Sequence, residues 1–157
     1  MSRRRKADKR ILTPDPRYNS ELVAYMINGI MERGKKAVAA SIVYGALDDI
    51  QKKMKDEDPL AVFNKAVDNV KPKLEVKSRR VGGATYQVPL EVSPKRQIAL
   101  ACRWLIQYSG ARRGMPMRRA LSIELMDAYA GQGSAIKKRD DTHKMAQANK
   151  AFAHYKW

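Results

Sequence analysis

Cations stand directly before a double glycine near the middle of the chain. The run VKSRRVGG at residues 76–83 contains Lys77, Arg79 and Arg80. A guanidinium is always charged, and its planar fork of donors matches the oxygens of a phosphate group. The chemistry available to these residue types is therefore recognition of a polyanion through its phosphates.

The segments on both sides of the glycines alternate between apolar and polar residues. Leu74 and Val76 alternate with charged residues on one side, and Tyr86, Val88, Leu90 and Val92 alternate with polar residues on the other. Alternation around a Gly-Gly pair predicts a β-hairpin over residues 73–92. An isolated hairpin is only marginally stable in water. We therefore expect its base to pack on the rest of the protein, through Leu74, Val76, Val88 and Leu90.

The hairpin would present its cations on both faces. Lys73, Lys77 and Arg79 are expected on one face and Arg80 on the other, a charged ribbon that suits a groove or junction of nucleic acid. Two interpretations of Tyr86 remain open. Its ring can stack on an unpaired base, or it can pack against Val81.

The charge of the whole chain is strongly positive and unevenly distributed. Lys and Arg number 32 against 16 acids, a net charge of +16. Residues 1–17 and residues 71–96 each carry seven basic and two acidic groups, residues 103–119 carry five arginines and no acid, and residues 137–157 carry six basic and two acidic groups. An ordinary soluble surface mixes its signs, so segregated positive charge indicates a polyanionic partner.

Several other basic motifs could bind anions. The amino-terminal cluster suits either a solubility tail or an arm that orders on RNA, and its arginines favour RNA. Lys35 and Lys36 stand at a predicted helix start, where the helix dipole disfavours cations, so either an external anion or a hydrated loop explains them. Lys95 and Arg96 follow a predicted cap in the same way. The last candidates are four arginines in a segment that contains no acidic residue: Arg112, Arg113, Arg118 and Arg119.

Residues with catalytic or metal-binding potential are few. The chain has two histidines and one cysteine, so it lacks a Cys/His cluster with zinc spacing. Gly82 and Gly83 lie between strands rather than before a helix, which argues against a phosphate-binding loop of a nucleotide enzyme. We expect neither enzyme activity nor a cofactor or metal, and we expect Cys102 to be a small core residue. With a single cysteine, no membrane-length apolar run and no signal peptide, the expected location is cytoplasmic.

Helical periodicity accounts for most of the remaining chain. Residues 1–17 are expected to be a basic arm that is disordered when free, and residues 152–157 a tail. The predicted fold is mainly α, a single domain over residues 1–157 consisting of a helical bundle with one protruding hairpin. The predicted helices run from the cap Asn19 or Ser20 to Gly34, after Lys36 through Met54, from the cap Asp58 to before Pro72, from Pro94 through Tyr108, from Pro116 to Gly131, and from Ser134 to about Ala151.

Three segments resemble one protein family. SELVAYMINGIMERGKKAVAASIVYGA at residues 20–46 resembles the signature of the S-seven family of small ribosomal subunit proteins. NVKPKLEVKSRRVGGATYQVPLEVSPKRQ at residues 69–97 and MAQANKAFAHYKW at residues 145–157 are similar to the same family in its bacterial form. The resemblance covers the whole chain.

The resemblance implies a six-helix bundle with a protruding hairpin and a basic extended arm. It implies a primary binder of the 3′ major domain of 16S rRNA that nucleates assembly of the head of the subunit. Exit-site tRNA and mRNA would lie near the hairpin tip at Gly82, Gly83 and Tyr86, and neighbouring head and platform proteins would be partners. Some members also repress their own message, and the sequence leaves this open. The implied rRNA contacts are Arg3, Arg4, Arg5, Lys6, Arg10, Lys35, Lys36, Lys73, Lys77, Arg79, Arg80, Lys95, Arg96, Lys137 and Lys138.

Two other classes of function compete with this interpretation. A DNA-binding architectural protein would also be basic and helical, but a helix-turn-helix reader needs one helix with an exposed basic face. Here the clearest cations lie on loops and helix ends. An RNA-modifying enzyme would need a cofactor motif, and we find none in the sequence.

Overall fold

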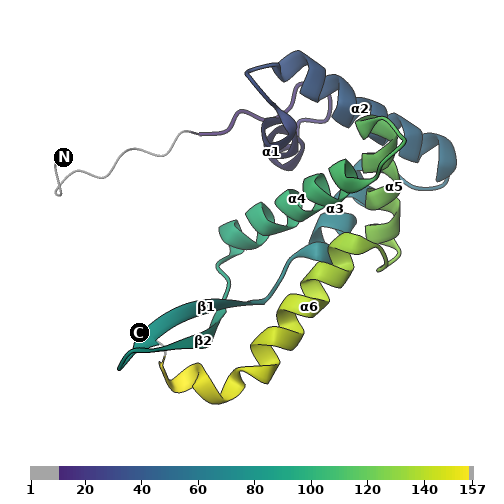
Figure 1. Cartoon of the computed structure of the whole chain (residues 1–157). Helices are drawn as coiled ribbons and strands as arrows, with labels where there is room; N and C mark the ends of the chain where they lie inside the picture. Colours follow the sequence, from purple (N-terminus) through teal and green to yellow (C-terminus); the bar gives the residue numbers. More distant parts are fainter. Residues whose placement is uncertain (1–10, 156–157) are drawn as a thin grey trace, which may run out of the picture.

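A computed structural model describes residues 11–155 of the 157-residue chain as six α-helices, one β-hairpin and one 3₁₀ helix (Figure 1). The prediction of a mainly helical fold with one two-stranded antiparallel hairpin is confirmed. The elements are α1 (Glu21–Ile30), α2 (Lys36–Lys53), α3 (Pro59–Val70), β1 (Leu74–Val81), β2 (Ala84–Glu91), α4 (Pro94–Ala111), α5 (Met117–Tyr129), α6 (Ser134–Ala148) and the 3₁₀ helix η1 (Lys150–Tyr155).

Local capping signals explain where the helices begin. The Ser20 hydroxyl accepts the Val23 amide, and the Asp58 carboxylate accepts the amides of Leu60 and Ala61, so both predicted caps are confirmed. The predicted end of the first helix is wrong, because α1 ends at Ile30. Gly34 lies instead in the turn to α2, with a φ of +76° that favours glycine.

The amino-terminal arm is anchored at its carboxyl end. Asp15, predicted to be part of the disordered arm, is only 3 % exposed. Its carboxylate accepts the amides of Arg17 and Tyr18 at 3.0 Å and the hydroxyl of Tyr44 on α2. That hydrogen bond raises the pKa of Tyr44 to about 12. The turn around Asp15 therefore belongs to the folded body.

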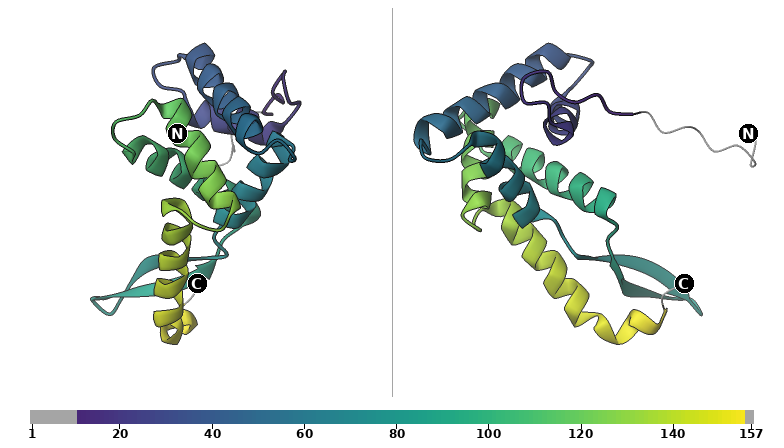
Figure 2. Two further views of the ribbon diagram at one scale, coloured as in Figure 1. Left: turned by 90° about the vertical axis from the view of Figure 1, so that its right-hand side faces the viewer. Right: turned by 180° about the vertical axis from the view of Figure 1, so that it is seen from behind.

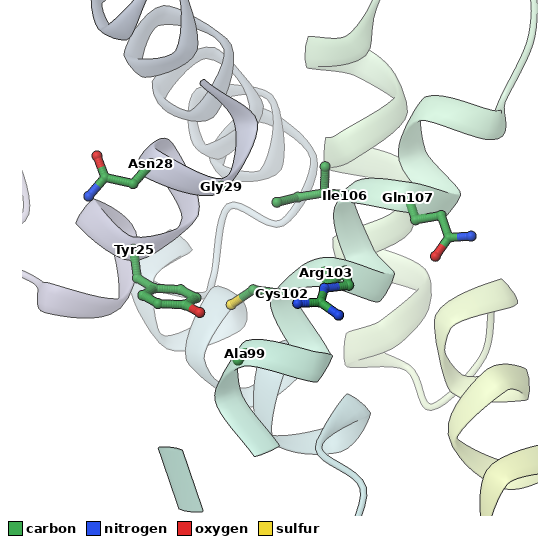
Figure 3. A pocket seen from close by; sticks show the side chains of 8 residues that line it. All are labelled: Tyr25, Asn28, Gly29, Ala99, Cys102, Arg103, Ile106 and Gln107. Atoms are coloured by element: carbon green, nitrogen blue, oxygen red, sulfur yellow. The ribbon is translucent and has the colours of Figure 1, made fainter. Parts of the chain in front are cut away.

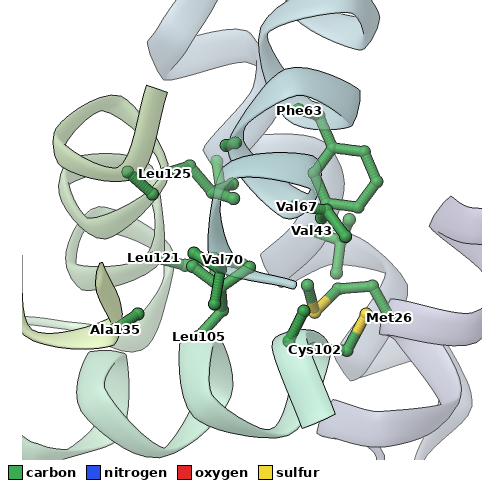
Figure 4. Close-up of a cluster of buried hydrophobic side chains, with 14 of the residues drawn as sticks. Met26, Val43, Phe63, Val67, Val70, Cys102, Leu105, Leu121, Leu125 and Ala135 are labelled. Atoms are coloured by element: carbon green, nitrogen blue, oxygen red, sulfur yellow. The ribbon is translucent and has the colours of Figure 1, made fainter. Parts of the chain in front are cut away.

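The core lies among the six α-helices, with Ala135 and Ile136 supplied by the start of α6 (Figure 4). Met26 from α1, Leu47 from α2, Phe63 from α3, Leu105 from α4 and Leu121 from α5 are fully buried. Helix α5 packs against α2, α3 and α4, so it forms the centre of the bundle. These apolar faces follow the 3.6-residue spacing of the sequence.

The register of the hairpin decides which residues share a face. Gly82 and Gly83 form a two-residue turn with φ of +56° and +88°, and Val81 pairs with Ala84. Residues opposite one another point to the same face. Lys77 is opposite Val88, whereas Val76 is opposite Pro89. Leu74, Val76, Val88 and Leu90, which were expected to pack on the rest of the protein, therefore divide between the two faces. None of the four is exposed, and Val88 alone among them is fully buried.

The carboxyl-terminal segment supports the hairpin. A tail was predicted from residue 152, but α6 ends at Ala148 and η1 lies against β2 (Figures 1 and 2). The ring of Tyr86 lies 5.3 Å from that of Phe152 and 4.9 Å from that of Tyr155, between ring centroids. The hairpin therefore rests on α6 and η1 before any partner is bound.

Candidate nucleic-acid interface

The hairpin presents most of its cations to solvent. Lys73, Lys77 and Arg80 are exposed. Arg79 is half-buried, because its guanidinium donates to the carbonyl oxygen of Tyr155 on η1. Arg79 is therefore held against the folded body. Arg79 is fixed in position, while Arg80 on the other face points outward.

An acid at the hairpin base balances some of this charge. Glu75 accepts the Arg96 Nε at 2.8 Å, and Lys77 Nζ lies 3.5 Å from the same carboxylate. The link between Glu75 and Arg96 joins β1 to the first turn of α4. It places Lys95 and Arg96, both exposed, beside the base of the hairpin.

Two other predicted basic sites lie at helix starts. Lys35 and Lys36 are exposed at the beginning of α2, which has neither an acid in its first turn nor a side-chain cap. Lys137 is exposed and Lys138 half-buried in the first turn of α6, which also lacks an acid there. Amide groups at a helix start can bind an anion, but at α6 the Ala135 amide already donates to the Glu124 carboxylate. Anion binding at these sites stays a prediction.

The arginine-rich segment between α4 and α5 divides into paired and unpaired side chains. Arg112 donates to Glu124 and Asp127 at 2.6 Å each, and the hydrogen bond to Glu124 raises the pKa of its guanidinium. Arg118 makes a bidentate contact with Asp49 on α2 at 2.6 and 3.0 Å, which lowers the pKa of that carboxyl. Arg113 and Arg119 are exposed and make no ion pair with any described residue.

The remaining predicted residues are the amino-terminal cations and the hairpin tip. Arg3, Arg4, Arg5, Lys6 and Arg10 fall outside the described residues 11–155. At the hairpin tip, Gly82 and Gly83 are exposed. Tyr86 is half-buried against η1, a third arrangement beside the two that the sequence left open.

A groove between α1 and α4 was not found by sequence reasoning (Figure 3). Its volume is about 560 Å³, and Tyr25, Asn28, Arg103 and Gln107 supply its polar lining. The only signal in the sequence is that these residues fall outside the apolar stripes of their helices. Gly29 lets the helices approach closely, since a Cβ there would lie 2.8 Å from Cδ1 of Ile106.

Side chains suited to catalysis are not gathered in the described part of the chain. Burial raises the pKa of the Cys102 thiol to about 12, which leaves it protonated and unreactive at neutral pH. Among residues 11–155, no three or more His, Cys, Asp or Glu side chains are grouped to hold a metal ion. Over the same range, no helix combines the length and apolar character needed to cross a membrane.

Comparison with known proteins gives one consistent result. The profile of the family described as ribosomal protein S7p/S5e matches residues 2–150. Proteins called small ribosomal subunit protein uS7 are 59 % identical in Desulfotalea psychrophila and 60 % identical in Sorangium cellulosum, over all of both chains. The protein of the same name in Thermotoga neapolitana is 57 % identical over 99 % of both chains. The chain therefore belongs to the ribosomal protein S7p/S5e family.

Proposed function

We propose that this protein is a structural constituent of the small ribosomal subunit and that it binds rRNA directly. One observation carries the proposal beyond family membership. Arg112 and Arg118 pair with acids, whereas many exposed cations of the hairpin, the helix starts and the segment between α4 and α5 do not. The residues that form no ion pair with another described residue include Lys35, Lys36, Lys73, Arg80, Lys95, Arg113, Arg119 and Lys137.

The proposed target is the 3′ major domain of 16S rRNA, and the proposed role is to nucleate assembly of the head. The resemblance of the hairpin and of the carboxyl-terminal residues to the bacterial family supports this target. Exit-site tRNA and mRNA would lie near the hairpin tip, and the other partners would be neighbouring head and platform proteins. The site of action is the cytoplasmic ribosome.

The predicted contact residues take different parts in this proposal. Exposed cations such as Arg80 and Lys95 bind phosphate directly, and the amino-terminal cations add to this by their charge. Arg112 and Arg118 have their guanidinium groups engaged by acids, so they act chiefly by positioning Arg113 and Arg119. Phosphate contacts of this kind fix the orientation of a protein on RNA, while unpaired bases and RNA shape supply the specificity.

Competition binding tests the proposal. The full chain is mixed with a fragment of the 3′ major domain, with fragments of other small-subunit rRNA domains and with duplex DNA, all at one stated salt concentration. We expect the first fragment to bind most tightly. Replacing Lys35 and Lys36 with Ala should weaken that binding, whereas Lys52→Ala, an exposed cation at the other end of α2, should not. Equal affinity for duplex DNA would favour the architectural DNA-binding alternative.

A further inference from the structure

The groove between α1 and α4 has the composition of a binding site rather than of a packing defect. One wall carries Tyr25 and Asn28 from α1, and the other carries Ala99, Arg103 and Gln107 from α4. Figure 3 shows the Tyr25 ring reaching from α1 toward Cys102, with Arg103 beyond it on α4. Its volume of about 560 Å³ falls in the range of about 300–1,000 Å³ typical of small-ligand sites.

The electrostatics of the groove favour an anionic ligand. No acid is among its described lining residues, and Arg103 is exposed. Within residues 11–155 the Arg103 guanidinium makes no hydrogen bond or ion pair, in contrast to Arg112 and Arg118. Other arginines of the bundle are paired with acids. An arginine that lacks an acid partner can bind an external phosphate instead.

The aromatic wall offers a surface for stacking. Tyr25 is 39 % exposed, one of few large apolar side chains at the surface of the described residues. No described aromatic side chain packs on its ring. The amides of Asn28 and Gln107 lie at the two rims of the groove, where they can reach the edge or sugar of a nucleotide.

The groove continues beyond this site toward a predicted RNA contact. A second hollow of about 440 Å³ shares Gly29, Ile106 and Gln107 with the first and extends to Lys35, with Glu32 as the one acid in its lining. A strand whose phosphate is bound by Arg103 thus has a path along α4 to the cation at the start of α2. Double-stranded RNA is too wide for such a groove, whereas a single strand with splayed bases suits it.

We propose that this groove binds an unpaired nucleotide of the RNA, with the base stacked on Tyr25 and a flanking phosphate on Arg103. The inference rests on the proposed rRNA-binding function and adds a subsite to it. Stacking on an aromatic ring is tolerant of base identity, because every base has a π-face. The subsite therefore selects unpaired over paired RNA rather than one base over another.

Binding measurements with matched variants test the subsite. For a 3′ major domain fragment that contains unpaired junction nucleotides, Tyr25→Ala should weaken binding by about 5- to 150-fold, the loss typical of one stacked base. Tyr25→Phe keeps the ring and should bind as the unmodified chain does. Arg103→Gln should also weaken binding, whereas Lys52→Gln should not. Because Tyr25 and Arg103 are exposed, thermal unfolding of all four variants should match that of the unmodified protein.

Two further readouts make the outcomes distinct. Thiouridine-substituted RNA should cross-link to the peptide that carries Tyr25, and a fully paired RNA should bind Tyr25→Ala and the unmodified chain equally. If the unmodified chain fails to bind the rRNA fragment, the proposed function itself fails. If the unmodified chain binds the fragment, and Tyr25→Ala and Arg103→Gln bind it as tightly as the unmodified chain does, only the subsite is overturned. Normal RNA affinity combined with impaired entry of Tyr25→Ala into subunits would assign the groove to a neighbouring protein and would also overturn the subsite.

Discussion

Glu124 joins three parts of the chain from a position with no exposed surface. Its Oε2 accepts the Arg112 Nε at 3.1 Å and Nη2 at 2.6 Å, and its Oε1 accepts the Ala135 amide at 2.9 Å. These contacts link α5 to the end of α4 and to the start of α6. A buried charge is tolerated when it is paired and hydrogen-bonded in this way.

We expect Glu124→Gln to lower the free energy of unfolding by about 1–3 kcal/mol, because the amide cannot neutralise the half-buried Arg112. Urea unfolding followed by circular dichroism measures the change. Asp127→Asn is the matched control, since Asp127 pairs with the same guanidinium at 39 % side-chain exposure and should matter by less than about 1 kcal/mol. Equal effects of the two substitutions would contradict the role given to burial.

His143 should make the attachment of the hairpin sensitive to pH. Its Nε2 accepts the backbone amide of Lys73 at 2.9 Å, which requires a neutral ring. Burial lowers the pKa of His143 below its ordinary value of about 6.5, with a further lowering by Arg139 and Lys73 and an opposing effect of Asp140. A depressed pKa contributes stability that is present above about pH 6.5 and is lost as the pH falls through the folded value.

The Lys73 amide should therefore exchange with solvent faster at pH 5 than at pH 7.5, after correction for intrinsic exchange rates. Nuclear magnetic resonance of the uniformly labelled protein can follow this amide. His143→Ala should remove the difference, whereas His154→Ala, which alters an exposed ring on η1, should preserve it. Persistence of the difference in His143→Ala would assign the pH dependence to another group.

At the scale of elements, η1 acts as a support for the hairpin. Arg79 donates to the Tyr155 carbonyl, and Tyr86 packs on Phe152 and Tyr155. We expect Arg79→Ala to loosen η1, so that amides of residues 152–155 exchange faster. Arg80→Ala removes an equal charge from the exposed face and should leave η1 unchanged while still weakening RNA binding. Unchanged exchange in Arg79→Ala would mean that the aromatic contacts suffice.

Val88 provides the buried anchor of the hairpin. Its side chain has no exposed surface, whereas Val76 opposite Pro89 is half-buried. Val88→Ala should lower the free energy of unfolding by about 1–3 kcal/mol through loss of two buried methyl groups and the cavity that remains. Val38→Ala is the matched control at a 55 % exposed site and should change it by at most about 0.5 kcal/mol. Thermal unfolding of both variants provides the comparison, and a Val88→Ala protein as stable as the control would show that the hairpin base is anchored elsewhere.

At the scale of the whole molecule, a net charge of +16 makes RNA binding dependent on salt. Each phosphate that a cation neutralises releases condensed counterions. If six to ten phosphates are neutralised, affinity for the rRNA fragment should fall about 10³- to 10⁵-fold between roughly 50 and 200 mM salt, by analogy with duplex DNA. Filter binding over this range gives the slope. A nearly flat dependence would contradict binding through phosphates.

The sequence by itself determined the six α-helices, the hairpin and the family, but not η1 or the end of α1. Ser20 and Asp58 act as caps, Pro59 and Pro94 open helices, and Gly82-Gly83 closes the hairpin, because each signal acts over a few neighbouring residues. The clustering of positive charge along the sequence likewise indicated a polyanionic partner, and this inference did not depend on the fold. The motifs at residues 20–46 and 69–97 were distinctive enough to identify the family.

Only the tertiary structure decided which of these residues are available. Arg118 meets Asp49 from 69 positions away, and Tyr86 packs on an element that begins at Lys150. The groove likewise brings Tyr25 from α1 to Arg103 on α4. Such contacts depend on how whole helices pack, so no local pattern of charge or hydropathy can distinguish a paired arginine from one that is open to RNA.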